Sequence, residues 1–161
     1  MTPEVRWVLA CLRSLQRGET PPPPLSDLRW DAVLASAEAE GLAPALGFVL
    51  KAKAPEGMPG AVRERLSRNL ADSVACQLVL SRELAGLLRR FEAARVPVIP
   101  LKGPALGETL YPDPALRPSS DLDLLIRRET LLPVDGLLQS LGYRRLPDAH
   151  SWDFEIGRAH V

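Results

Sequence analysis

The chain has 161 residues, enough for one ordinary domain or for one domain and part of another. Hydrophobic residues make up 46% and charged residues 25%, a composition typical of a soluble globular protein. Lys plus Arg and Asp plus Glu both number 20, so the net charge of zero gives no argument for a nucleic-acid or membrane partner.

The amino terminus has no basic segment followed by a continuous apolar core, as a signal peptide has. No apolar run approaches the roughly 20 residues that a membrane-spanning helix needs. The sequence therefore predicts a cytoplasmic protein.

Residues 1–94 have the apolar spacing of helices and form the first predicted domain. Thr2 can cap a first helix that ends at Gly18. The proline run at 20–24 predicts a stiff extended linker.

Three further helices are predicted before the pattern changes. Ser26 or Asp27 can cap the second, which stops at Gly41, and a shorter third helix covers 43–53. The fourth is a long amphipathic helix over about 59–94, because no internal proline interrupts it. Its predicted apolar stripe consists of Val62, Leu66, Leu70, Val74, Leu78, Leu84, Leu88 and Phe91. The arginines of this helix mostly lie off the stripe and are expected to face solvent.

The two cysteines, Cys11 and Cys76, are far apart and have no CxxC spacing. Each falls within an apolar helical stripe, so both are expected to be reduced and buried.

Residues 95–161 have a different pattern, in which short β-branched runs alternate with helical ones. The predicted order is strand, helix, strand, helix and strand, over about 96–101, 104–111, 121–126, 129–142 and 143–146, with a loop over 112–120. Together with the helical first part, this order predicts an α+β fold with a small sheet that helices cover on one side.

The segment RPSSDLDLLI contains Asp121 and Asp123, which point to the same face if the segment is a strand. Leu122, Leu124 and Ile126 then point to the core. Two neighbouring carboxylates repel each other, and a divalent cation such as Mg²⁺ removes that cost. The alternative is a pair of solvent-facing aspartates partnered by Arg117 or Arg127, and the D-x-D pattern alone does not exclude it.

A strand followed by Lys102, Gly103 and a helix start is the second candidate element. Glycine lets a ligand approach the backbone, and lysine adds positive charge for a phosphate. An ordinary strand-to-helix turn explains the glycine but not the lysine. Arg117 could pair with Asp121 or reach a phosphate.

These pieces together resemble the uncharacterised nucleotidyltransferase family of bacterial proteins. Members typically show an LKG turn, a tyrosine, an arginine shortly before D-[IL]-D-L, and a Gly-Tyr after the next helix. Here these are Leu101–Gly103, Tyr111, Arg117, Asp121–Leu124 and Gly142–Tyr143. The resemblance covers about residues 95–145.

The resemblance implies a polymerase-β-like nucleotidyltransferase fold with a small mixed sheet, which binds a nucleoside triphosphate and Mg²⁺ or Mn²⁺. It implies that Gly103 and Lys102 hold phosphate and that Asp121 and Asp123 bind the metal. The acceptor hydroxyl is unidentified, and no nucleic acid or membrane is indicated as a partner.

The chain departs from the superfamily pattern in two ways. Gly103-Pro104 stands where Gly-Ser or Gly-Gly is usual, which removes a hydroxyl and one backbone donor. The third carboxylate of the superfamily lies on a later strand, usually further past the Gly-Tyr than this chain extends, so we expect it to be absent here; Asp153 and Glu155 are the alternative candidates. The final residues EIGRAHV lack the character of the preceding chain and end without a helix signal. We therefore expect an incomplete domain from a longer protein.

Three functions remain open from the sequence. The first is a Mg²⁺-dependent nucleotidyltransferase. The second is a noncatalytic module that keeps the fold and binds nucleotide or protein. The third is a helical interaction domain whose two aspartates are only solvated surface.

Overall fold

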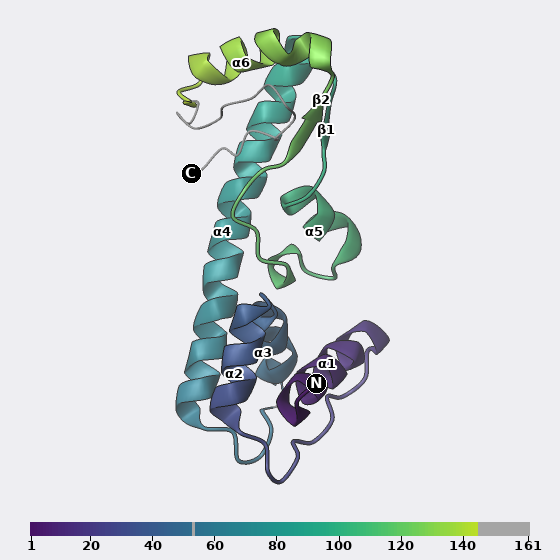
Figure 1. Ribbon diagram of the computed structural model, residues 1–161, viewed down its shortest axis with the longest axis vertical. Coiled ribbons are helices and arrows are strands. Elements are labelled where there is room, and N and C mark those ends of the chain that lie inside the picture. Colours follow the sequence, from purple (N-terminus) through teal and green to yellow (C-terminus); the bar gives the residue numbers. More distant parts are fainter. Residues whose placement is uncertain (53, 145–161) are drawn as a thin grey trace. The chain divides into compact units, whose positions relative to one another are not determined.

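The computed structural model describes residues 1–52 and 54–144, and it shows an α+β protein (Figure 1). The described chain forms two compact units. Unit 1 contains residues 1–75 and 111–118, and unit 2 contains residues 76–110 and the described residues from 119 onward. The domain division after residue 94 stays a prediction. One long helix, α4 (Gly60–Ala93), contributes to both compact units.

Helix α1 (Pro3–Arg17) of unit 1 begins and ends where the sequence predicts. The Thr2 hydroxyl accepts the Val5 N–H at 3.4 Å, and Pro3 occupies the first helical turn. At the other end Gly18 adopts φ +66°, and the Glu19 N–H donates to the Ser14 carbonyl. This is a Schellman end, which needs the left-handed conformation that glycine adopts without strain.

Helix α2 (Trp30–Ala39) begins later than predicted, and the expected cap at Ser26 or Asp27 is wrong. Residues 26 and 27 form a turn instead, and Leu28 donates its N–H to the Leu25 carbonyl. Arg29 is the cap residue and makes no side-chain capping bond. Its guanidinium instead makes a tertiary contact with α1.

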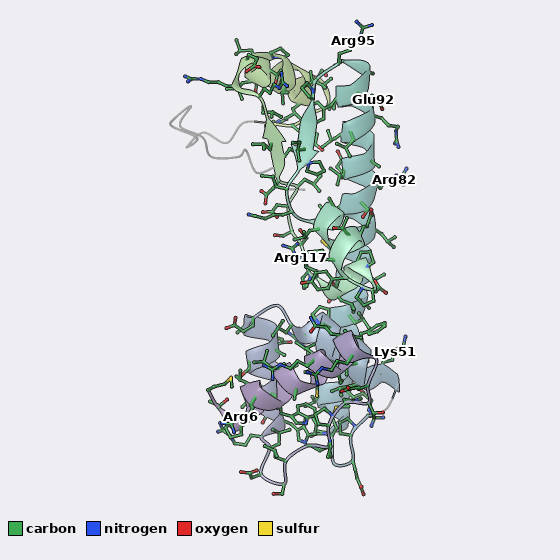
Figure 2. All side chains as sticks on the ribbon, turned by 90° about the vertical axis from the view of Figure 1, so that its right-hand side faces the viewer. Arg6, Lys51, Arg82, Glu92, Arg95 and Arg117 are labelled. Carbon is green, nitrogen blue, oxygen red and sulfur yellow. The ribbon has the colours of Figure 1, made fainter. Side chains whose placement is uncertain are left out.

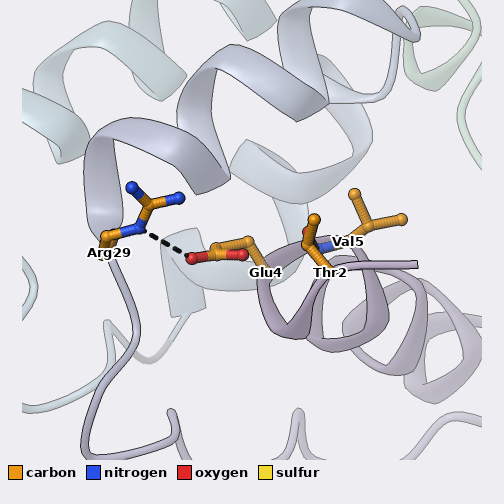
Figure 3. Close-up of polar contacts among 4 residues, drawn as sticks. All are labelled: Thr2, Glu4, Val5 and Arg29. Carbon is orange, nitrogen blue, oxygen red and sulfur yellow. Dashed lines mark hydrogen bonds and ion pairs between the residues drawn. The ribbon is translucent and has the colours of Figure 1, made fainter.

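That contact is the ion pair between Arg29 Nε and Glu4 Oε1, at 3.2 Å (Figure 3). Glu4 lies in the first turn of α1 and is buried, whereas Arg29 is exposed. The pKa of Glu4 is lowered from its ordinary value. The largest cause is a hydrogen bond from its own backbone N–H, and hydrogen bonds from Arg29 and Thr2 contribute less. The pair therefore joins the starts of α1 and α2 in its ionised form.

The core of unit 1 lies among α1, α2, α3 (Ala43–Ala52) and the first part of α4. Trp7 and Trp30 meet edge to face with ring centroids 5.4 Å apart. The Trp7 indole N–H donates to the carbonyls of Pro22 and Pro23, which fastens the proline-rich linker to α1. The buried members are Trp7, Val8, Cys11, Val33, Ala37, Ala43, Leu46, Leu50, Met58, Val62 and Leu66.

The 3₁₀ helix η1 (Pro114–Leu116) also belongs to unit 1, although it follows much of unit 2 in the sequence. It packs against α3, and the buried Ser73 hydroxyl of α4 donates to the Ala115 carbonyl at 2.6 Å. The loop that the sequence predicts over 112–120 therefore contains an ordered helical turn.

Helix α4 buries a different face in its middle from the one predicted. Val62, Leu66, Leu84 and Phe91 of the predicted stripe are buried, but Val74 and Leu78 are exposed. The buried residues include Leu66, Ser73, Leu80 and Leu87, spaced by seven. Two buried positions in the middle are polar, Ser73 and Gln77, and for this reason the apolar pattern misplaces the face. The arginines at 63, 65, 68, 82, 89 and 90 are exposed, as expected, and Arg82 points away from the strands (Figure 2).

Unit 2 has a two-stranded antiparallel sheet, β1 (Val98–Pro100) and β2 (Leu124–Ile126), beside α4 (Figure 1). Helix α5 (Pro104–Leu110) follows β1, and the 3₁₀ helix η2 (Arg128–Thr130) leads into α6 (Leu131–Ser140). The core of unit 2 has the buried members Leu80, Leu84, Leu87, Phe91, Leu122 and Val134.

Side chains from the strands and from α6 close this core. Val98, Leu124 and Ile126 pack on it from the sheet. The Tyr143 hydroxyl donates to the Glu83 carboxylate of α4. Burial raises the pKa of Tyr143, and the hydrogen bond to Glu83 raises it further, so the phenol stays protonated. Tyr143 and Arg144 of the predicted last strand are not in a strand, and residues 145 and 146 lie outside the described residues.

The two cysteines differ, and the prediction that both are buried is wrong for Cys76. Cys11 is fully buried in the core of unit 1, and desolvation by burial raises the pKa of its thiol to about 12. Cys76 is exposed, and both thiols are free. Within residues 1–52 and 54–144, no helix is both long and apolar enough to cross a membrane.

Candidate functional site

The bend after β1 forms one side of the candidate site. The ladder continues past the strand, because the Leu101 N–H donates to the Asp123 carbonyl at 2.9 Å. The chain then turns at Gly103, which has φ +64°, and α5 begins at Pro104. Proline suits a first helical position because no partner is needed there for its missing N–H. The predicted strand, glycine bend and helix are all present.

The D-x-D segment lies directly before β2, rather than within it, and forms the other side of the candidate site. Leu122 is buried in the core of unit 2, and Leu124 packs on it. Asp121 and Asp123 lie outside the assigned strand, so a shared direction of their side chains away from that core stays a prediction. Asp121 is half-buried and Asp123 is buried.

The two sides of the site meet at Gly103. A Cβ atom added to this glycine would lie 2.9 Å from the Asp121 carbonyl oxygen and 3.2 Å from Ser119 Oγ. Real Cβ atoms essentially never approach a backbone oxygen so closely. Only glycine therefore lets the segment that carries the aspartates lie against the bend.

Two hydrogen bonds hold the segment before the aspartates. The Ser119 hydroxyl donates to the Asp121 carbonyl at 3.2 Å, and the Cys76 thiol of α4 donates to the Ser119 carbonyl at 3.1 Å. The sequence offers no signal for Ser119 or Cys76 in this role, because both contacts depend on where α4 passes the loop. Within unit 2 the loop is thus tied to α4 at one end and to β1 at the other.

Asp123 forms an ion pair with Lys102, with Nζ and Oδ2 3.2 Å apart. The sequence suggests Arg117 or Arg127 as partners of the aspartates, and it does not suggest Lys102. Arg127 instead lies 3.9 Å from Glu129, where both side chains are exposed. The register Pro100↔Leu124 brings Lys102 beside Asp123, and a register between strands is not visible in single-strand patterns.

Arg117 follows η1 and belongs to unit 1, whereas the other four candidate residues belong to unit 2. It is half-buried, and its N–H donates to the Pro114 carbonyl. The structure thus brings together Lys102, Gly103, Asp121 and Asp123, and the role of Arg117 in the site stays a prediction. Tyr111, the tyrosine of the family pattern, is exposed.

The donor set can be compared with the needs of a divalent cation. In the described part of the chain, no group of three or more His, Cys, Asp or Glu residues is placed to hold a metal ion. Mg²⁺ commonly takes only one or two carboxylates and completes its shell with water and phosphate oxygens. Asp121 and Asp123 fit that requirement. The candidate third carboxylates, Asp153 and Glu155, lie outside the described residues.

Comparison with known proteins gives one family. Residues 26–160 match the family described as uncharacterised nucleotidyltransferase, which is most of the chain. Searches of curated proteins and of solved structures gave no match. The matched range begins within unit 1 and includes both the glycine bend and the D-x-D segment. The chain therefore belongs to the family of uncharacterised nucleotidyltransferases.

Proposed function

We propose that this protein transfers a nucleotidyl group from a nucleoside triphosphate to an acceptor hydroxyl in a Mg²⁺-dependent reaction. The observation that carries the proposal is the packing of the D-x-D segment against the glycine bend, where Gly103 approaches the Asp121 carbonyl. A carboxylate pair beside a bend without a side chain can hold a cation and a polyphosphate next to each other. Family membership supports the same class of reaction.

Each residue has a separate task in this proposal. Asp121 and Asp123 hold Mg²⁺ or Mn²⁺ through carboxylate oxygens. A bound cation would neutralise phosphate charge while the acceptor oxygen bonds to the α-phosphorus, pyrophosphate leaves and the hydroxyl proton passes to solvent. Gly103 keeps the bend close against the segment that carries the aspartates, and Lys102 would offer a cationic donor to phosphate oxygens.

The first prediction concerns the two aspartates. Asp121→Asn/Asp123→Asn removes the anionic metal ligands, so we expect Mg²⁺-dependent binding of ATP or GTP to weaken at least about tenfold. Isothermal titration calorimetry on the full chain measures this change. Asp27→Asn/Asp31→Asn is the matched control, since it removes two charges from exposed positions in unit 1. Equal affinity of the D-x-D variant and the wild type would show that this segment holds no metal.

The same samples separate catalysis from binding. Release of pyrophosphate and transfer of labelled nucleotide to an added acceptor would support the transferase. Tight Mg²⁺-dependent binding without pyrophosphate release, across a panel of sugar, peptide and small-molecule acceptors, would favour the noncatalytic nucleotide-binding module.

A further inference from the structure

The ion pair between Lys102 and Asp123 is strongly asymmetric. The Asp123 side chain is 8% exposed, whereas the Lys102 side chain is 62% exposed. The ion pair of Arg127 and Glu129 in the same unit differs, because both of its side chains are 71% exposed. Lys102 therefore neutralises a carboxylate that has little contact with water, while the lysine itself stays largely in solvent.

This asymmetry has a consequence for what happens when the pair separates. A buried carboxylate without a nearby positive charge is costly, so Asp123 requires a counter-charge at all times. A lysine ammonium on a flexible stem is strongly hydrated and can leave for water at little cost. Of the two partners, only Lys102 can therefore be exchanged easily for another cation.

We propose that Lys102 is an exchangeable counter-ion of the metal site. In the absence of a divalent cation its ammonium neutralises Asp123; a divalent cation displaces it; and the displaced ammonium is then free to contact the triphosphate. This inference rests on the proposed function, because it requires that Asp123 accept a metal. It explains why lysine stands beside the glycine bend, which an ordinary strand-to-helix turn does not require.

The inference predicts opposite effects of one substitution on two ligands. Lys102→Met removes the competing charge, so Mn²⁺ alone should bind about tenfold more tightly than it binds to the wild type. The same variant lacks the displaced ammonium, so a non-hydrolysable ATP analogue with saturating Mn²⁺ should bind about tenfold more weakly. A lysine with only a structural role would not produce this reversal of sign.

Electron paramagnetic resonance of free Mn²⁺ and calorimetry measure the two affinities. Lys102→Arg keeps the charge and should bind Mn²⁺ within about twofold of the wild type. Lys51→Met is the matched control, because it removes an exposed lysine from unit 1 and should change neither affinity. Equal Mn²⁺ affinity of the wild type and Lys102→Met overturns the exchange, and it leaves the proposed function standing. No Mn²⁺ binding by any variant overturns the proposed function itself.

Thermal unfolding without metal gives a second measurement, which also covers a variant that folds poorly. Lys102→Met should lower the melting temperature, because Asp123 loses its counter-charge. In an Asp123→Asn background the same substitution should have little effect. If Lys102→Met does not fold, Lys102→Gln keeps a hydrogen-bond donor without the charge and takes its place in the Mn²⁺ titration. A melting temperature that falls equally in both backgrounds overturns the pairing on which the exchange depends.

Discussion

Gly103 shows at the scale of one residue how the site depends on a missing side chain. Its φ of +64° and its contact with the Asp121 carbonyl are two separate requirements. Gly18 has a similar φ of +66°, but an added Cβ would meet nothing within 4 Å. A comparison of substitutions at the two glycines therefore separates the effect of the close contact from the effect of the backbone conformation.

We expect Gly103→Ala to destabilise the protein by about 2 kcal/mol or more, and Gly18→Ala by about 1 kcal/mol. Both variants strain a left-handed residue, but only Gly103→Ala forces the segment with the aspartates away from the bend. Urea unfolding followed by circular dichroism measures the free energies of unfolding. Equal losses in the two variants would show that the loop moves aside freely, which would contradict a rigid site.

The buried position of Asp123 could be predicted only in part at this scale. Side chains of an extended segment alternate between its two faces, which predicts that both aspartates turn away from the core. Leu122, which stands between them, is buried, as the same alternation predicts. Burial of Asp123 beside Lys102 was not predictable, since it depends on the register of β1 against β2. A local pattern predicts which way a side chain points, whereas the ion-pair partner of that side chain depends on a segment elsewhere in the chain.

Among the helices, α4 ends at a residue with a strained backbone, Arg95. Arg95 adopts φ +57°, and the Val96 N–H donates to the Phe91 carbonyl in a Schellman arrangement. Gly142 occupies the equivalent position after α6 with φ +93°. Arg95 is exposed at the helix end, with its side chain pointing outward (Figure 2), so a glycine there loses no buried contact.

We expect Arg95→Gly to stabilise the protein by about 0.5 kcal/mol. Glycine relieves the left-handed strain, which costs about 1–2 kcal/mol. This gain exceeds the free-energy cost of the additional backbone entropy that glycine loses on folding. Arg90→Gly, within the last turns of the same helix, should instead destabilise by about 1 kcal/mol. Chemical denaturation of both variants checks the sign, and a loss of stability in Arg95→Gly would mean that its side chain contributes more than the strain costs.

The described part of the molecule as a whole contains two hydrophobic clusters, one in each compact unit. Leu46 of α3 is fully buried in the first, and Leu87 of α4 is buried in the second. Leu78 of α4 is equally apolar but 67% exposed. Hydrophobicity alone therefore does not identify the residues that stabilise each unit.

We expect Leu46→Ala and Leu87→Ala each to destabilise the protein by about 2–5 kcal/mol, because each leaves a cavity in its cluster. Leu78→Ala should change stability by less than about 0.5 kcal/mol. In a Trp152→Phe background, fluorescence of Trp7 and Trp30 reports on unit 1, and circular dichroism reports on all helices. A large loss in Leu78→Ala would mean that the exposed part of α4 is covered in the folded protein.

The sequence by itself determined the start and end of α1, the length of α4 and the strand-bend-helix order around Gly103, because these follow from local spacing, caps and turn residues. The family was identified separately, from the resemblance of its ordered motifs. Tertiary structure alone decided which face of α4 is buried, why η1 belongs to unit 1 and which cation neutralises Asp123. Polar Ser73 is buried because its hydroxyl bonds the Ala115 carbonyl 42 positions away. Such contacts satisfy polar and charged groups across distant segments, and no local pattern records them.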